Sequence, residues 1–332
     1  MRVLQHDADM RKTQLRNYLR QLVLTVPLTA GACGGSSDGP ADQSVYRCNP
    51  DLPGPAHRSY AWTGADGGTD CTAFCIDRLN ADNVGFRSSE VTCNVQSPID
   101  LDAGTSEVLC AYLAPSGCGR APAGLARPQL DESTAAGAYW ARAAHLEAAS
   151  VEAFERLASE LAAHDAPAEL VVRARSAAAD ERRHVNLVGA LATRAGARVP
   201  DVNVTPFFVR PLLDIAIENT REGEVAETYG AVVALYQSQH APDDAVRETM
   251  TLVADDELSH AELSWDIGRW LATRLSPSER IQLGVIRQQA AAVLRAQLVV
   301  DERPQLGLPD AVEALVLLDA LSKNLWSCVA TG

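Results

Sequence analysis

From Asp131 onward the chain mixes apolar alanine and leucine with charged glutamate and arginine, and helix-breaking residues occur only at intervals. Proline or glycine stands where helices of this kind begin and end, as at Pro167, Gly196 and Pro242. The pattern predicts an all-α fold with helices over residues 132–164, 167–196, 206–240, 242–274, 277–302 and 310–326.

The first four predicted helices form a near-repeat. Pro167 lies fourteen residues before Glu181, and Pro242 lies fifteen residues before Glu257. The first and second helices, and the third and fourth, are therefore predicted to form two helical hairpins of the same design. Residues 196–206 would connect the hairpins, and each hairpin would contribute half of a shared site.

The same repeat carries two copies of the pattern Glu-x-x-His, each preceded by aspartate. They occupy residues 180–184 (Asp-Glu-Arg-Arg-His) and 256–260 (Asp-Glu-Leu-Ser-His). On a helix, positions i and i+3 face the same side, so each copy offers a carboxylate and an imidazole to one point in space. Two such pairs, with a glutamate from each of two other helices, are the ligands of a two-iron carboxylate site in a four-helix bundle.

The additional glutamates lie on the helix that precedes each motif. Glu147 is thirty-four residues before Glu181, which puts the two side chains at similar height in a hairpin that turns near residue 165. Glu224 and Glu227 lie thirty-three and thirty residues before Glu257. They are i, i+3 neighbours, so both are candidates for the last ligand position, and both could coordinate.

Two iron ions held close together need bridging carboxylates to offset their charge, and neutral imidazoles that keep the redox potential useful. The sequence predicts Glu181 and Glu257 as the bridges and one histidine, His184 or His260, for each metal. Manganese and zinc are not excluded by these ligand types. The predicted ligands are Glu147, Glu181, His184, Glu224, Glu227, Glu257 and His260.

Asp180 and Asp256 are predicted to support the histidines. A metal-bound histidine normally donates its other ring N–H to a carboxylate or carbonyl, and these aspartates are the natural partners, on the same or the facing helix. The alternative is a bundle without metal, in which the acidic residues and histidines form a buried hydrogen-bond network.

Residues 131–275 resemble the ferritin-like superfamily, which contains ferritins, rubrerythrins and di-iron hydroxylases. The resemblance rests on the segments 147–154 (Glu-Ala-Ala-Ser-Val-Glu-Ala-Phe), 179–184, 224–228 and 254–260. It implies a four-helix bundle, here with two extra C-terminal helices, and the ligand set above, with Glu224 matching an additional carboxylate of rubrerythrin-type sites. The chain lacks the paired Cys-x-x-Cys knuckles through which electrons enter rubrerythrin, and its N-terminal part has no counterpart in cage-forming ferritins.

The N-terminus resembles a bacterial lipoprotein export signal over residues 1–32. Basic residues precede the short apolar stretch 22–30, and small residues lead directly to Cys33, the candidate for lipidation. Residues 33–44 would be a flexible linker, and translation starts at either Met1 or Met10. The alternative is a disordered N-terminus in which the cysteine is incidental.

Residues 45–127 form a cysteine-rich segment with turn-forming residues and short β-prone stretches, ahead of the helical domain at 128–332. An even number of closely spaced cysteines predicts three disulfides in an oxidising compartment, with fifteen pairings open; a zinc site is the alternative. Cys328 is left over near the C-terminus. The six cysteines are Cys48, Cys71, Cys75, Cys93, Cys110 and Cys118.

The net charge of −14 argues against a nucleic-acid partner and against electrostatic adhesion to a membrane, so membrane association is expected only through a lipid anchor. We expect an exported protein of the bacterial cell envelope, with a di-iron site that reacts with O₂ or peroxide. Its substrate and electron donor are not specified by the sequence. The alternative function is a scaffold lipoprotein, metal-free or loaded with manganese or zinc, that binds a protein or glycan. A homodimer through the last two helices stays open.

Overall fold

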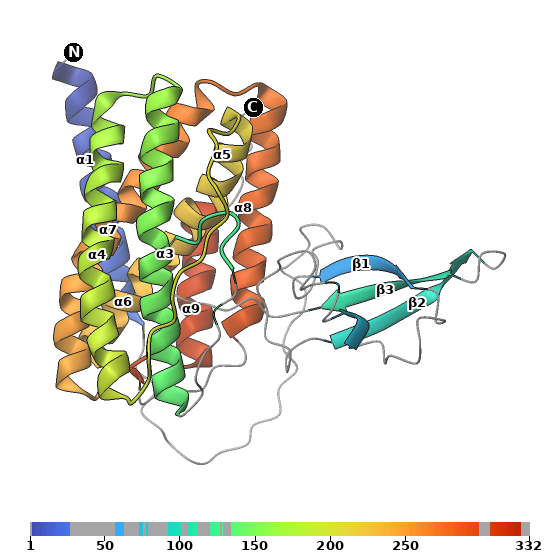
Figure 1. The fold of residues 1–332 in the computed structure, drawn as a ribbon. Coiled ribbons are helices and arrows are strands. Elements are labelled where there is room, and N and C mark those ends of the chain that lie inside the picture. The colour runs from blue at the N-terminus through green and yellow to red at the C-terminus, as the bar shows by residue number, and fades with distance from the viewer. Residues whose placement is uncertain are drawn as a thin grey trace, which may run out of the picture.

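The computed structural model describes residues 2–26, 57–62, 73–75, 78, 92–100, 105–111, 120–126, 128, 134–298 and 306–326. Its main body is a bundle of long helices (Figure 1), which confirms the predicted helical class. The helices of the bundle are α3 (Ala135–Ala163), α4 (Ala168–Arg194), α5 (Leu212–Glu218), α6 (Thr228–His240), α7 (Asp244–Ala272), α8 (Pro277–Leu298) and α9 (Ala311–Leu321).

Two hairpins form the centre of the bundle, as the repeat predicted. Helix α3 packs along α4, helix α6 packs along α7, and α4 also contacts α7. The first hairpin turns at Asp165, which has a positive φ of 56°, and the amide of Ala166 closes the turn on the carbonyl of Leu161. The shared design therefore brings the two motif-bearing helices, α4 and α7, against each other.

The third predicted helix begins later than expected, at Leu212 rather than at residue 206. The residue before a proline is disfavoured in the helical region, so the helix starts only after Pro211. The helix also contains an unpredicted π-helical segment, η2 (Asn219–Glu227), between α5 and α6. Such widened turns often occur at functional sites. Trp326, in the C-terminal π-helix η4 (Ser322–Trp326), donates its indole N–H to the carbonyl of Glu224 at 3.0 Å.

An N-terminal helix, α1 (Arg2–Thr25), packs against α6, α7 and α9. Leu19 and Val23 are almost fully buried in the bundle core, and Arg16 donates hydrogen bonds to Ser259 and Glu262 on α7. Sequence reasoning expected no such packing, because a basic segment followed by an apolar one fits an export signal equally well. None of the helices in the described ranges is long and apolar enough to cross a membrane.

The cysteine-rich segment contains a three-stranded antiparallel sheet in the order β1 (His57–Trp62), β3 (Thr105–Ala111), β2 (Thr92–Asp100). The register sets Cys93 opposite Cys110. Cys75 is disulfide-bonded. The three-disulfide framework stays a prediction, and Cys33, Cys48, Cys71, Cys118, Cys328 and the linker 33–44 lie outside the described residues.

The apolar core of the bundle is divided into two clusters. One contains Val188, Val232 and Leu258, and the other contains Phe154 and Ile267. The carboxylates and imidazoles of the two motifs lie on the same helices between these apolar stretches. A polar layer inside a hydrophobic bundle costs folding free energy unless its charges are paired or bound to metal. This layer is therefore the candidate functional site.

Candidate metal centre

Helical periodicity explains why the motif side chains point inward. On α4, the buried positions run Ala174, Ala177, Ala178, Glu181, His184 and Val188, so glutamate and histidine replace apolar residues on an otherwise apolar face. Helix α7 repeats this arrangement with Glu257 and His260. Each of the six side chains that gather here is at most 3% exposed. They are Glu147, Glu181, His184, Glu227, Glu257 and His260.

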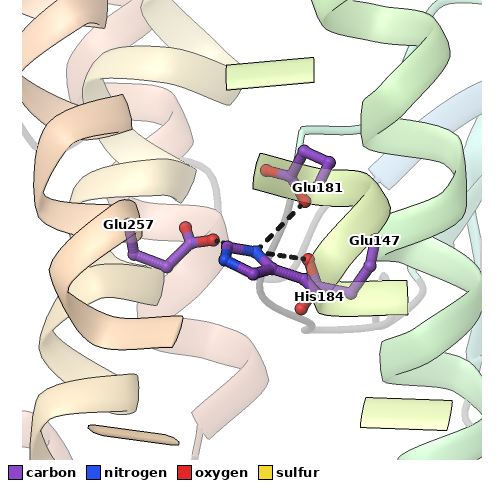
Figure 2. Close-up of side chains that lie close together, drawn as sticks. All are labelled: Glu147, Glu181, His184 and Glu257. Atoms are coloured by element: carbon purple, nitrogen blue, oxygen red, sulfur yellow. Dashed lines mark ion pairs between the residues drawn. The ribbon is translucent and has the colours of Figure 1, made fainter. Parts of the chain in front are cut away.

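The first group of potential ligands surrounds His184. Glu147, Glu181, His184 and Glu257 each offer an atom within 4.8 Å of the others. The Nδ1 atom of His184 lies 3.6 Å from Glu147, 3.5 Å from Glu181 and 3.3 Å from Glu257. Figure 2 shows these three carboxylates directed toward the imidazole from three different helices. One metal ion placed among these atoms would have three oxygen donors and one nitrogen donor.

The second group is built in the same way around His260. Its members are Glu181, Glu227, Glu257 and His260, again with atoms within 4.8 Å of one another. The Nδ1 atom of His260 lies 3.1 Å from Glu181, 3.9 Å from Glu227 and 3.6 Å from Glu257. Glu181 and Glu257 belong to both groups, which is the position that the sequence predicted for bridging carboxylates.

The donor atoms themselves fit a pair of metal ions. Buried carboxylate oxygens of Glu181, Glu227 and Glu257 and the Nδ1 atoms of His184 and His260 have no hydrogen-bond partner among the described residues. Unsatisfied buried polar atoms are rare in folded proteins, and here they converge on two neighbouring points. Four carboxylates would balance the charge of two divalent cations, and mixed oxygen and imidazole donors suit iron, manganese or zinc.

Burial and neighbouring charges shift the proton affinities of the side chains in this site. Burial raises the pKa of Glu147 well above its usual range, and the nearby Glu181 carboxylate adds to this effect. Burial, followed by the charge of Glu257, does the same to the pKa of Glu227. Burial alone would lower the pKa of His184 and that of His260, but the surrounding carboxylates raise both well above the ordinary value.

Each histidine contacts one of the two predicted aspartates, and in both cases it is the aspartate of the other motif. The Nε2 atom of His184 lies 3.1 Å from Asp256, and the Nε2 atom of His260 lies 3.4 Å from Asp180. Each histidine is therefore oriented from the facing helix. Arg183, which sequence reasoning did not single out, links the two aspartates at 2.7 Å from Asp180 and 2.9 Å from Asp256.

Because each aspartate contacts the histidine of the other motif, a change in one motif should affect the metal position of the other. Asp256→Asn should weaken metal binding about 10- to 100-fold mainly at the His184 position, and Asp180→Asn should do so mainly at the His260 position. The reason is that each carboxylate fixes the tautomer and the ring orientation of the histidine opposite it. Titration with Co²⁺, followed by the histidine NMR signals, would assign each loss. Equal losses at both positions in each variant would contradict the crossed arrangement.

Glu224 does not join either group of potential ligands. Its carboxylate accepts a hydrogen bond from the Nε atom of Arg287 on α8 at 2.7 Å. The same side chain packs closely against Gly268 on α7. The expectation that Glu224 and Glu227 face the same way assumed an α-helix. Both lie in the π-helix η2, where the wider turn directs them to different neighbours.

Glu224→Gln should therefore leave the number of bound metal ions unchanged. We expect a loss of stability instead, of about 1–3 kcal/mol, because the half-buried Arg287 loses its charged partner. Metal analysis and thermal unfolding of the same preparation separate the two effects. A fall in metal content without a change in stability would restore Glu224 as a ligand.

Two further residues near the site were not predicted as site residues. Phe154 lies with its ring centroid 5.0 Å from that of His260, and the buried guanidinium of Arg120 lies 5.8 Å from the Phe154 ring. Phe154 is one apolar residue among many on α3, and Arg120 comes from the connection that precedes the bundle. Only the folded chain brings either of them to the centre.

Comparison of the chain with protein-family models, with curated proteins and with solved structures found no match. The assignment of the site therefore depends on its own geometry. The helical bundle and its two buried groups of carboxylates and histidines are compatible with a ferritin-like metal site.

Proposed function

We propose that this protein is a member of the ferritin-like superfamily that binds two iron ions and acts as an oxidoreductase with O₂ or peroxide. One observation carries the proposal: two groups of buried potential ligands share Glu181 and Glu257, and the Nδ1 atoms of their histidines make no hydrogen bond with any described residue. This combination suits a pair of metal ions better than it suits a hydrogen-bond network, whose members would satisfy one another.

Two ferrous ions bound at this place would supply two electrons to a small oxidant. The residues of the chain would bind and orient them. Glu181 and Glu257 would bridge, Glu147 with His184 would complete one position, and Glu227 with His260 would complete the other. Asp180 and Asp256 would hold the Nε2 protons of the histidines, so that Nδ1 stays free to coordinate. The apolar clusters on the same helices would limit the access of water.

Iron is the metal of the proposal because four carboxylates and two imidazoles stabilise both its ferrous and its ferric state. Manganese and zinc fit the same donors, and zinc would give a centre without redox activity.

The localisation in the cell envelope is proposed from the N-terminal sequence alone. The burial of Leu19 and Val23 against the bundle favours a different fate for α1, namely retention as a structural helix. Intact-mass analysis of the protein from a membrane fraction distinguishes the two. A chain that starts at a lipid-modified Cys33 supports export and anchoring, and a chain that retains α1 argues against both.

The proposed function is tested by oxidising the iron-loaded protein. The full chain is loaded anaerobically with Fe²⁺, mixed with O₂ or hydrogen peroxide, and followed by near-ultraviolet absorption and oxidant consumption. Equal amounts of Fe²⁺ are added to the unchanged protein and to the Glu181→Gln/Glu257→Gln variant. We expect iron oxidation with the unchanged protein to be at least tenfold faster. Equal rates with both proteins would contradict the proposal.

A further inference from the structure

Arg120 lies in the connection before the long helices, and its positively charged side chain is buried in the bundle. It is 0% exposed, and its carbonyl accepts a hydrogen bond from Ser150 on α3 at 3.1 Å. Its Nη1 donates to Asn219 at 3.5 Å, the limit of a hydrogen bond. Its Nε and Nη2 atoms have no hydrogen-bond partner within the described part of the chain. A guanidinium this deeply buried and this poorly satisfied is uncommon.

The position of Arg120 connects it with the second half of the metal centre. Its guanidinium lies 5.8 Å from the ring of Phe154, and that ring lies 5.0 Å from the imidazole of His260. Gly223 also lies close to Arg120. A Cβ atom added at Gly223 would lie 2.9 Å from Nη1 of Arg120 and 2.6 Å from the hydroxyl of Ser264. Glycine at this position in η2 therefore leaves room for the arginine one turn before Glu227.

The charge of Arg120 is only partly balanced by its neighbours. Among the described residues, Arg120 pairs with the carboxylate of Glu218, which lies 3.9 Å from Nη2. Glu218 pairs more closely with Arg210, at 2.6 Å, and Arg210 also binds Glu160 at 2.7 Å. Burial and the Glu218 charge raise the pKa of Glu222 to about 7, so Glu222 carries only part of a negative charge at neutral pH. Of these charges, that of Arg120 lies against the Phe154 ring, which in turn lies against His260.

We propose that Arg120 is a positioning residue that raises the reduction potential of the metal pair through its fixed charge. This inference rests on the proposed di-iron function. Oxidation of the two ions adds positive charge to a buried site, and a fixed cation nearby makes that addition less favourable. Arg120 thus stabilises the ferrous state.

The test is the reduction potential of the iron-loaded full chain, measured by a spectroscopic redox titration. At a fixed applied potential, Arg120→Met should increase the ferric-to-ferrous ratio about tenfold. This is the order of the effect expected when one unit charge is removed about 10 Å from the metal, at an effective dielectric constant of about 20. This equals a fall of about 59 mV for a one-electron step. Arg120→Lys keeps the charge and should stay within about twofold of the unchanged protein.

Two further variants guard against a purely structural effect. Arg156→Met removes an arginine that also holds the connection, by hydrogen bonds to the carbonyls of Ala123 and Thr205, and it should leave the potential unchanged. Glu218→Gln removes the partial balance of Arg120 and should shift the ratio the opposite way, toward ferrous iron. This variant keeps the idea testable if Arg120→Met does not fold.

The outcomes separate this inference from the proposed function. An unchanged potential in Arg120→Met with two irons bound overturns the role of Arg120 and leaves the di-iron centre intact. Equal shifts in the methionine and lysine variants, or a shift of the same sign in Glu218→Gln, also overturn it. A wild-type protein without redox-active metal overturns both proposals.

Discussion

The double change Glu181→Gln/Glu257→Gln should reduce metal binding from about two ions per chain to none. Both carboxylates belong to both ligand groups, so each metal position loses two of its four donors at once. Glutamine keeps the size of the side chain and lacks the negative charge that the cations need. Metal analysis after gel filtration in the presence of excess Fe²⁺ measures the effect.

The matched control is Glu313→Gln. Glu313 is also a buried glutamate, but it lies away from the centre, where it accepts a hydrogen bond from Tyr236 at 2.6 Å. This variant should keep about two ions per chain. Circular dichroism should show an unchanged helical fold in all three proteins. Retention of even one tightly bound ion by the double variant would mean that the bridging assignment is wrong.

Metal binding should release between two and four protons per chain near neutral pH. In the metal-free protein, the surrounding carboxylates raise the pKa values of His184 and His260, and burial raises those of Glu147 and Glu227. Groups with raised pKa values bind protons more tightly, and a metal ion must displace the protons that are bound. The apparent affinity should therefore fall as the pH falls, about tenfold per pH unit for each proton displaced.

Calorimetry in buffers of different ionisation enthalpy counts the released protons. Glu147→Gln removes one of the titrating ligands and should reduce the count by up to one proton, whereas Glu313→Gln should not change it. Metal binding with no proton release would contradict the prediction, because it would require histidines and glutamates that are already deprotonated in the metal-free protein.

The sequence predicted which side chains gather at the candidate metal centre where local periodicity decides their direction. The spacing of Glu181 and His184 fixes their common face on any α-helix, and the same holds for Glu257 and His260. Glu147 followed from the length of a helical hairpin. The orientation of the aspartates was left open, because whether Asp180 supports its own motif or the facing one depends on how the helices pack.

The features that the sequence did not predict have equally specific causes. Glu224 was grouped with Glu227 because a regular helix was assumed, and neither the π-helix nor the distant partner Arg287 has a local signal. Arg120 reaches the centre through contacts with residues about one hundred positions away. The apolar residues of α1 fit both a signal segment and a core helix, so composition alone does not decide between them.

The central claim is a pair of metal ions bound by four glutamates and two histidines. Its most direct test is the metal content of the full-length protein, purified after expression in iron-supplemented medium, together with its optical spectrum. We predict about two irons per chain and a near-ultraviolet absorption that bleaches on reduction. A protein with an unchanged helical fold that binds no metal, even after reconstitution with Fe²⁺, would contradict the account.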